Sequence, residues 1–169
     1  TENHNMFVLR FADFSLRAFD ASTDQPLAPA LPADEPIVAG NHISADGRTL
    51  VVRGATRIFV WDTATGARRA TIDFGDRIPF LALSPDGERL LGTSPGGYIR
   101  QWSTITGALV GDEIRIPGVL AGQAPYVGYS PDGRLFFVGA FAARAQLYES
   151  VTGRKTGPIF GPESTLGAE

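Results

Sequence analysis

Short apolar runs recur along the whole chain, separated by turns that contain Gly, Pro, Asp or Ser. Bulky residues alternate between the two faces within a run, as Ile58 and Val60 do against Phe59 and Trp61. Such a strand has no side left for water, so it suits a sheet that is packed between two others. The pattern therefore predicts an all-β fold built from stacked sheets.

The length of the runs and their β-branched and aromatic content set the expected strands. We expect one group of three antiparallel strands followed by three groups of four. Their ranges are 6–11, 15–20 and 27–31; 37–43, 49–53, 57–61 and 68–74; 78–83, 89–93, 98–102 and 109–116; 126–129, 135–139, 145–149 and 155–160.

A four-residue turn motif punctuates these groups. It reads SPDG at 84–87 and at 130–133, and SADG at 44–47. Each copy is followed by an apolar run, an aromatic residue and a Thr-Gly pair. The aromatic positions are 42, 41 and 46 residues apart, and they are Phe19, Trp61, Trp102 and Tyr148. A period of this size is typical of propeller blades, which span roughly 40–45 residues.

The first copy of the repeat is degenerate. The segment around Trp61 aligns without a gap on Leu16 to Asp20 and Thr23-Asp24. In place of the SPDG motif, however, the first copy has residues 2–5, which do not match it. The repeat divides the chain into an incomplete first unit and three full units. Their bounds are 1–36, 37–76, 77–118 and 119–169.

These motifs resemble the WD-repeat (WD40) family, whose blades carry an SPDG hairpin, a Trp-Asp pair and a following Thr-Gly. The resemblance implies a β-propeller of about four four-stranded antiparallel blades, the first incomplete, within a ring of seven or eight. The chain departs from the family in two respects, because the Gly-His dipeptide of a typical blade is absent and only Trp61 is followed by Asp. The family's Asp-His-Ser-Trp hydrogen-bond network therefore cannot be transferred to any blade.

The expected first blade lacks its innermost strand, which leaves an unpaired edge near 6–11 and two apolar blade faces. Three interpretations follow: the chain is part of a longer polypeptide, it pairs with a second copy in an eight-bladed ring, or it closes alone as a four-bladed ring. We favour the first. Pairing comes second, because oligomers favour closed symmetry.

The amino-acid composition of the chain argues against several classes of function. Of 169 residues, 43% are hydrophobic and 20% charged, as in ordinary globular domains. A net charge of −3 leads us not to expect nucleic acid as a partner, since nucleic-acid binders carry basic stripes. The absence of Cys excludes disulfides and thiolate metal sites. No apolar run reaches the roughly 20 residues of a membrane span, and we expect a cytoplasmic protein with no membrane contact.

Three features resemble chemical sites but are better explained as structure. Ser94 lies in a G-x-S-x-G sequence, yet a nucleophile elbow needs a strand-to-helix turn and this one falls in a hairpin. His4 and His42 fall in different blades without an acidic cluster beside them. Asp46, Asp86 and Asp132 can each cap the backbone of their own turn. We therefore expect no catalytic, cofactor or metal site.

Four arginines form the candidate partner-binding rim, because each falls in or beside a hairpin between a second and a third strand. They are Arg53, Arg57, Arg100 and Arg144. Converging there, they would suit an acidic peptide, a nucleotide or a phosphate, although arginines that are solvated or paired between blades are the simpler expectation. The family resemblance implies a non-enzymatic scaffold for protein or peptide partners, the recruiting or sensing part of a larger protein. The alternative is a lactonase-like or hydrolase propeller whose site lies in missing blades.

Overall fold

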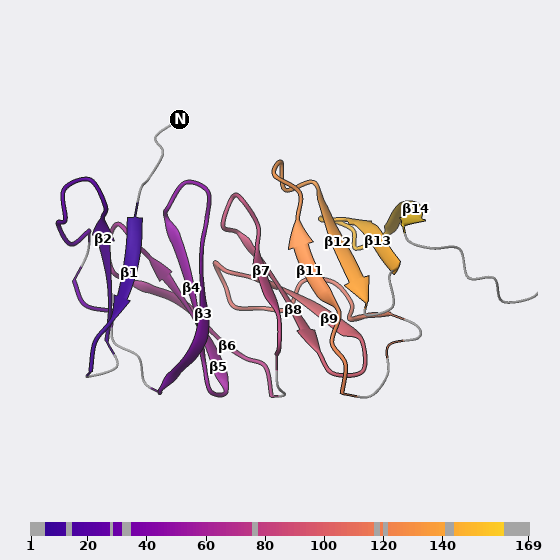
Figure 1. Ribbon diagram of the computed structural model, residues 1–169, viewed down its shortest axis with the longest axis horizontal. Coiled ribbons are helices and arrows are strands. Elements are labelled where there is room, and N and C mark those ends of the chain that lie inside the picture. Colours follow the sequence, from indigo (N-terminus) through magenta and orange to yellow (C-terminus); the bar gives the residue numbers. More distant parts are fainter. Residues whose placement is uncertain are drawn as a thin grey trace, which may run out of the picture.

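The computed structural model describes residues 6–12, 15–27, 29–31, 35–75, 78–116, 119, 122–140 and 144–160. All regular elements in these ranges are antiparallel β-strands, and they include no helix. The strands form four sheets that stand in a row in chain order (Figure 1). The prediction of an all-β fold is therefore confirmed.

Each sheet is a meander in which neighbouring strands are consecutive in the chain. The first sheet pairs β1 (Met6–Arg10) with β2 (Leu16–Asp20). The second contains β3 (Ile37–Ile43), β4 (Thr49–Gly54), β5 (Arg57–Asp62) and β6 (Arg68–Asp73). The third contains β7 (Leu81–Leu83), β8 (Arg89–Ser94), β9 (Tyr98–Ser103) and β10 (Ile114–Arg115). The fourth contains β11 (Tyr126–Tyr129), β12 (Leu135–Ala140), β13 (Arg144–Glu149) and β14 (Lys155–Phe160).

Three predicted strands are wrong in extent. Of the predicted strand 78–83, only Leu81–Leu83 forms a strand, β7. The segment 27–31 contributes only to isolated bridges, Leu16 with Leu31 and Phe19 with the preceding Pro26, so the first sheet has two strands and not three. Proline cannot donate a ladder hydrogen bond, which limits pairing there. The segment 109–116 is also interrupted, because Gly111 adopts a φ of 69° and only β10 continues the ladder.

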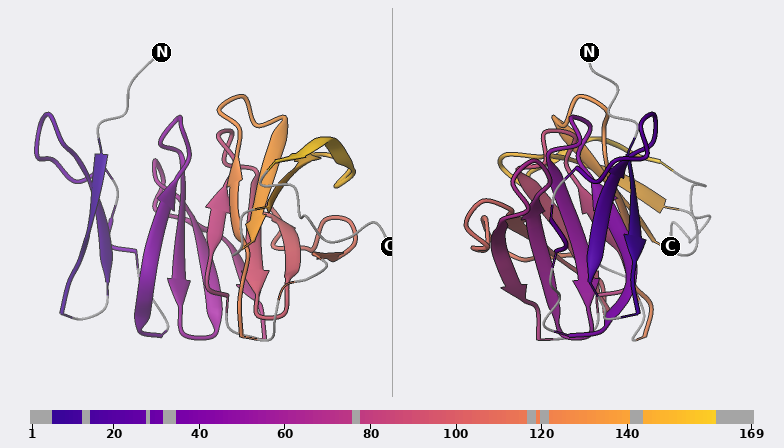
Figure 2. Two further views of the ribbon diagram at one scale, coloured as in Figure 1. Left: turned by 45° about the vertical axis from the view of Figure 1, so that its right-hand side comes forward. Right: turned by 90° about the vertical axis from the view of Figure 1, so that its left-hand side faces the viewer.

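Alternate residues of one strand pack into different layers, as the sequence pattern predicted. Leu50 and Val52 of β4 face the first sheet, whereas Val51 between them faces the third sheet. All three side chains are fully buried. Burying such a side chain contributes about 1.5–3 kcal/mol, so apolar layers on both faces of the second sheet hold the row together. Figure 2 shows the row of sheets from two further sides.

The SPDG turns lie along one edge of the row, the upper edge in Figure 1, which we call the SPDG edge. In the turn at 44–47 the Ser44 hydroxyl donates to Asp46 (2.5 Å), and Asp46 accepts from the Arg48 amide (2.9 Å). The turns at 84–87 and 130–133 repeat both bonds. The prediction that these aspartates cap their own turns is confirmed.

The Thr-Gly turns also recur, and the degenerate first copy forms one. The Gly66 amide donates to the Asp62 carbonyl (2.8 Å), and the Asp24 amide donates to the Asp20 carbonyl (2.9 Å). Gly66 has a φ of 71° and Asp24 a φ of 56°. The alignment of Thr23-Asp24 on a Thr-Gly pair is thus confirmed, with an aspartate in the left-handed conformation that glycine normally adopts.

Candidate functional site

The edge opposite the SPDG edge carries the hairpins between second and third strands, and Arg53 lies there at the end of β4. Its guanidinium Nη1 donates to the carbonyl of Ile78, and lies 3.4 Å from the carbonyl of Pro79. Both acceptors belong to the segment that leads into β7 of the third sheet. Arg53 therefore ties the second sheet to the third.

Arg10 makes the same connection one sheet earlier. It pairs with Leu16 in the first sheet as Arg53 pairs with Ile58 in the second. Its Nη1 donates to the carbonyl of Ile37 at 3.0 Å, at the start of β3. The two arginines are 43 residues apart, so the repeat phase was the signal that could have identified Arg10.

Thr93 occupies the equivalent position in the third sheet, where it pairs with Ile99. A threonine is too short to reach across as arginine does. Its side chain is fully buried, and its hydroxyl has no hydrogen-bond partner among the described residues. The third sheet thus has an uncompensated polar group where the first two have a cross-link.

His42 lies near the end of β3, opposite Val51, and is partly buried. Burial lowers the pKa of its imidazole, and the nearby charge of Arg53 lowers it further. The neutral form is therefore favoured. His4 lies outside the described residues.

Arg57 begins β5 and pairs with Glu35, whose carboxylate lies 3.7 Å from the Arg57 Nε. Glu35 accepts three further hydrogen bonds from the same hairpin: the Thr56 amide (3.1 Å), the Thr56 hydroxyl (2.9 Å) and the Arg57 amide (2.9 Å). Burial raises the pKa of the Glu35 carboxyl, but the bonds from Thr56 and Arg57 outweigh it, so the pKa lies below its usual value.

The two other predicted arginines lie farther along the row. The Arg100 Nε donates to Glu113 at 2.5 Å. Arg144 begins β13 opposite Ala140. Arg53 and Arg57 have partners in neighbouring units of the repeat, as the simpler expectation has it, whereas Arg100 pairs with Glu113 inside its own unit, 77–118. That the arginines also bind a partner stays a prediction.

A pocket of about 520 Å³ opens beside Arg53, between the second and third sheets. Gly54, Ala55 and Thr56 of the hairpin form one wall. The other lining residues are mostly apolar: Val38, Phe74, Gly75, Ile78, Pro79 and Phe80. Val38 is 57% exposed. The pocket combines apolar surface with a cationic group, which suits a peptide side chain.

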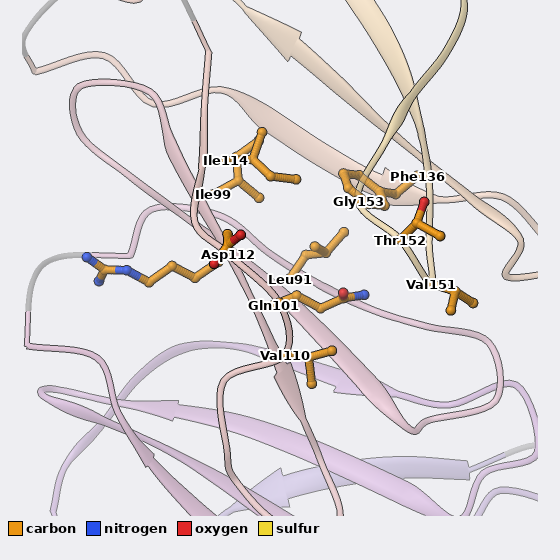
Figure 3. Close-up of a pocket in the computed structure, with 12 residues that line it drawn as sticks. Leu91, Ile99, Gln101, Val110, Asp112, Ile114, Phe136, Val151, Thr152 and Gly153 are labelled. Carbon is orange, nitrogen blue, oxygen red and sulfur yellow. The ribbon is translucent and has the colours of Figure 1, made fainter.

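A smaller pocket of about 200 Å³ lies where the outer strand of the third sheet is interrupted (Figure 3). Leu91, Ile99 and Ile114 face Phe136 and Gly153 of the fourth sheet across it. Arg100, Gln101, Asp112 and Thr152 also line this pocket, so its wall is polar as well as apolar.

Gln101 at this pocket links the third sheet to the fourth. Its amide nitrogen donates to the Tyr129 hydroxyl (2.9 Å) and to the Ser150 carbonyl (3.2 Å). Burial raises the pKa of Tyr129 to about 12. Sequence analysis missed Gln101 because its partners are 28 and 49 residues away.

Ser94 ends β8 and accepts a bond from the Gly97 amide within the β8–β9 hairpin, so the predicted hairpin is confirmed. Across the described part of the chain, no three His, Cys, Asp or Glu side chains are grouped as metal ligands. The same ranges contain no helix with the length and apolar character of a membrane span.

Comparison with known proteins gives no relative: no family model matches the chain, and no curated protein matches it.

Proposed function

We propose that the chain is a segment of a WD40-type β-propeller and a non-catalytic scaffold that binds a protein or peptide partner. The observation that carries this proposal is the recurrence of the SPDG bonds in three successive sheets. Sheets with the same turns and the same stacking register are the construction principle of propellers. Loops on such a rigid scaffold are common binding sites. The cytoplasmic location stays a prediction.

The two end faces of the row support the propeller. Leu9 pairs with Arg17 as Val52 pairs with Phe59, so Leu9 occupies a position that is buried one sheet later. Leu9 is 47% exposed, and Phe137 at the other end is 42% exposed. In the proposed ring, further blades cover these faces, from the same polypeptide or from a second copy. Light scattering on the chain measures whether copies associate, and a defined dimer supports pairing.

The 520 Å³ pocket is the proposed partner site, and peptide selection tests it. We expect a displayed library of random peptides to yield binders, and Val38→Glu to weaken them at least ten-fold because it places a charge in the apolar lining. Ile105→Glu is the matched control, since Ile105 is 56% exposed and lines neither described pocket. Failure to select any binder, or equal binding to both variants, contradicts the proposal.

A further inference from the structure

The hairpin that joins β4 to β5 is built as a receptor for one carboxylate. Three hydrogen-bond donors converge on Glu35, two consecutive backbone amides and one hydroxyl, and the Arg57 guanidinium adds an ion pair at 3.7 Å. One carboxylate oxygen accepts both amides, and the other accepts the hydroxyl. A charged acceptor makes stronger hydrogen bonds than a neutral one. We call this group of donors, from Thr56 and Arg57, the carboxylate cradle.

Gly54 completes the carboxylate cradle by leaving room for the ligand. A Cβ at this position would overlap the Glu35 carboxylate, with its carbons at 2.8 and 2.9 Å. Any other residue would displace the side chain from the donors. The backbone of the hairpin is therefore shaped around a carboxylate, beyond the needs of a tight turn.

We propose that the carboxylate cradle binds an acidic side chain of a partner peptide, and that Glu35 fills it in the free protein. This inference rests on the proposed scaffold function and names its ligand. Glu35 precedes β3 and lies in a connecting segment, where no ladder hydrogen bond fixes it. Its exchange for another carboxylate leaves the sheets intact.

The neighbouring pocket supports an incoming peptide. Gly54 and Thr56 belong both to the hairpin of the cradle and to the wall of the 520 Å³ pocket. A peptide that places its carboxylate in the cradle can therefore place an adjacent apolar side chain against Phe74 and Ile78. The expected recognition element is an acidic residue beside a large apolar one.

Glu35 competes with the partner because it is tethered next to the cradle. A tethered group acts at an effective concentration of the order of millimolar, which reduces the affinity of any free ligand. Removal of Glu35 should therefore strengthen binding. Glu113 provides a matched control, because it also pairs with an arginine, Arg100, but no described backbone amide donates to it.

The first test is chemical rescue by acetate. We expect 200 mM sodium acetate, compared with sodium chloride, to raise the melting temperature of Glu35→Ala by about 2–4 °C. The wild type and Glu113→Ala should not respond. Thr56→Val combined with Glu35→Ala should weaken the response, because the hydroxyl is lost and the two amides remain. If folded Glu35→Ala shows no difference between acetate and chloride, the carboxylate cradle is refuted.

The second test uses the peptides acetyl-Leu-Glu-Leu-amide and acetyl-Leu-Gln-Leu-amide in calorimetric titrations. We expect the Glu peptide to bind Glu35→Ala at least ten-fold tighter than wild type, and the Gln peptide to show no such gain. If Glu35→Ala does not fold, Glu35→Gln replaces it, with an expected gain of about three-fold. Equal binding of the two peptides overturns the proposal. Acetate rescue without any peptide binder from the random library would instead refute the scaffold function alone.

Discussion

The guanidinium of Arg53 donates to the main-chain carbonyl of Ile78, 25 residues later in the chain. This bond joins the end of β4 to the segment that leads into β7, and Arg10 repeats it one sheet earlier with Ile37. In both cases a charged guanidinium of one sheet is bonded to a main-chain carbonyl in or just before the first strand of the next. The bond fixes the distance between the two sheets at the edge of their apolar layer.

Replacement of Arg53 by Met should destabilise the protein by about 1.5–3 kcal/mol, because hydrogen bonds to charged groups contribute about that amount. Urea unfolding measures the free energy change. Arg48→Met is the control, since the Arg48 side chain is 74% exposed and should change stability by less than about 0.5 kcal/mol. If Arg53→Met and Arg48→Met lower the free energy of unfolding equally, the proposed structural role of Arg53 is contradicted.

Thr93→Val should leave the stability unchanged or raise it by about 1 kcal/mol. Its buried hydroxyl has no partner in the described structure, and valine has the same shape without the cost of a buried polar group. The same substitution at Thr63 should have the opposite sign, with a loss of about 1–2 kcal/mol, because that hydroxyl donates to the Gly47 carbonyl at 2.5 Å. Thermal unfolding of both variants compares the two signs directly.

Asp24→Gly should stabilise the protein by about 0.5–1 kcal/mol, because Asp24 has a φ of 56° and glycine adopts this conformation without strain. Gly66→Asp is the reverse substitution in the equivalent turn and should cost a similar amount. Chemical denaturation measures both. A destabilised Asp24→Gly would show that the aspartate side chain makes a contribution larger than the backbone strain.

Alkaline pH should destabilise the protein through Tyr129. Its pKa of about 12 in the folded state exceeds the usual 10, so the folded state retains the phenolic proton longer. The corresponding stability is complete below pH 10 and is lost as the pH rises through 12, by up to about 2–3 kcal/mol. Urea unfolding from pH 8 to 11.5 should show a steeper decline for the wild type than for Tyr129→Phe. Parallel curves would contradict this assignment.

The sequence predicted what depends on residues close together in the chain. Asp46 caps a turn within two residues of itself, so its role follows from the SPDG motif alone. The alternation of bulky residues along the strand likewise predicted that Phe59 and Val60 face opposite sides of the sheet. Pairing of arginines between blades was expected, but the acceptors were not predicted, because every residue has a main-chain carbonyl and the sequence does not mark those of Ile78 and Pro79.

The candidate site shows the same limit. Sequence analysis singled out Arg57 beside its hairpin, but the partner of Arg57, Glu35, lies in a connecting segment outside the turn motif. The geometry of a turn is set by residues that are adjacent in the chain, so it repeats wherever the sequence motif repeats. The contact of the Glu35 carboxylate with the Thr56 amide, 21 residues later in the chain, depends on the path of the chain.

The alternation of Leu50, Val51 and Val52 between two apolar layers couples the sheets during unfolding. If β4 separates from its neighbours, water enters both layers at once, and the first and third sheets lose buried surface together with the second. Local opening of β4 therefore requires a large free energy. Amide protons of β4 should exchange with solvent only in the cooperative unfolding of several sheets, and the middle of the row should be its slowest-exchanging part.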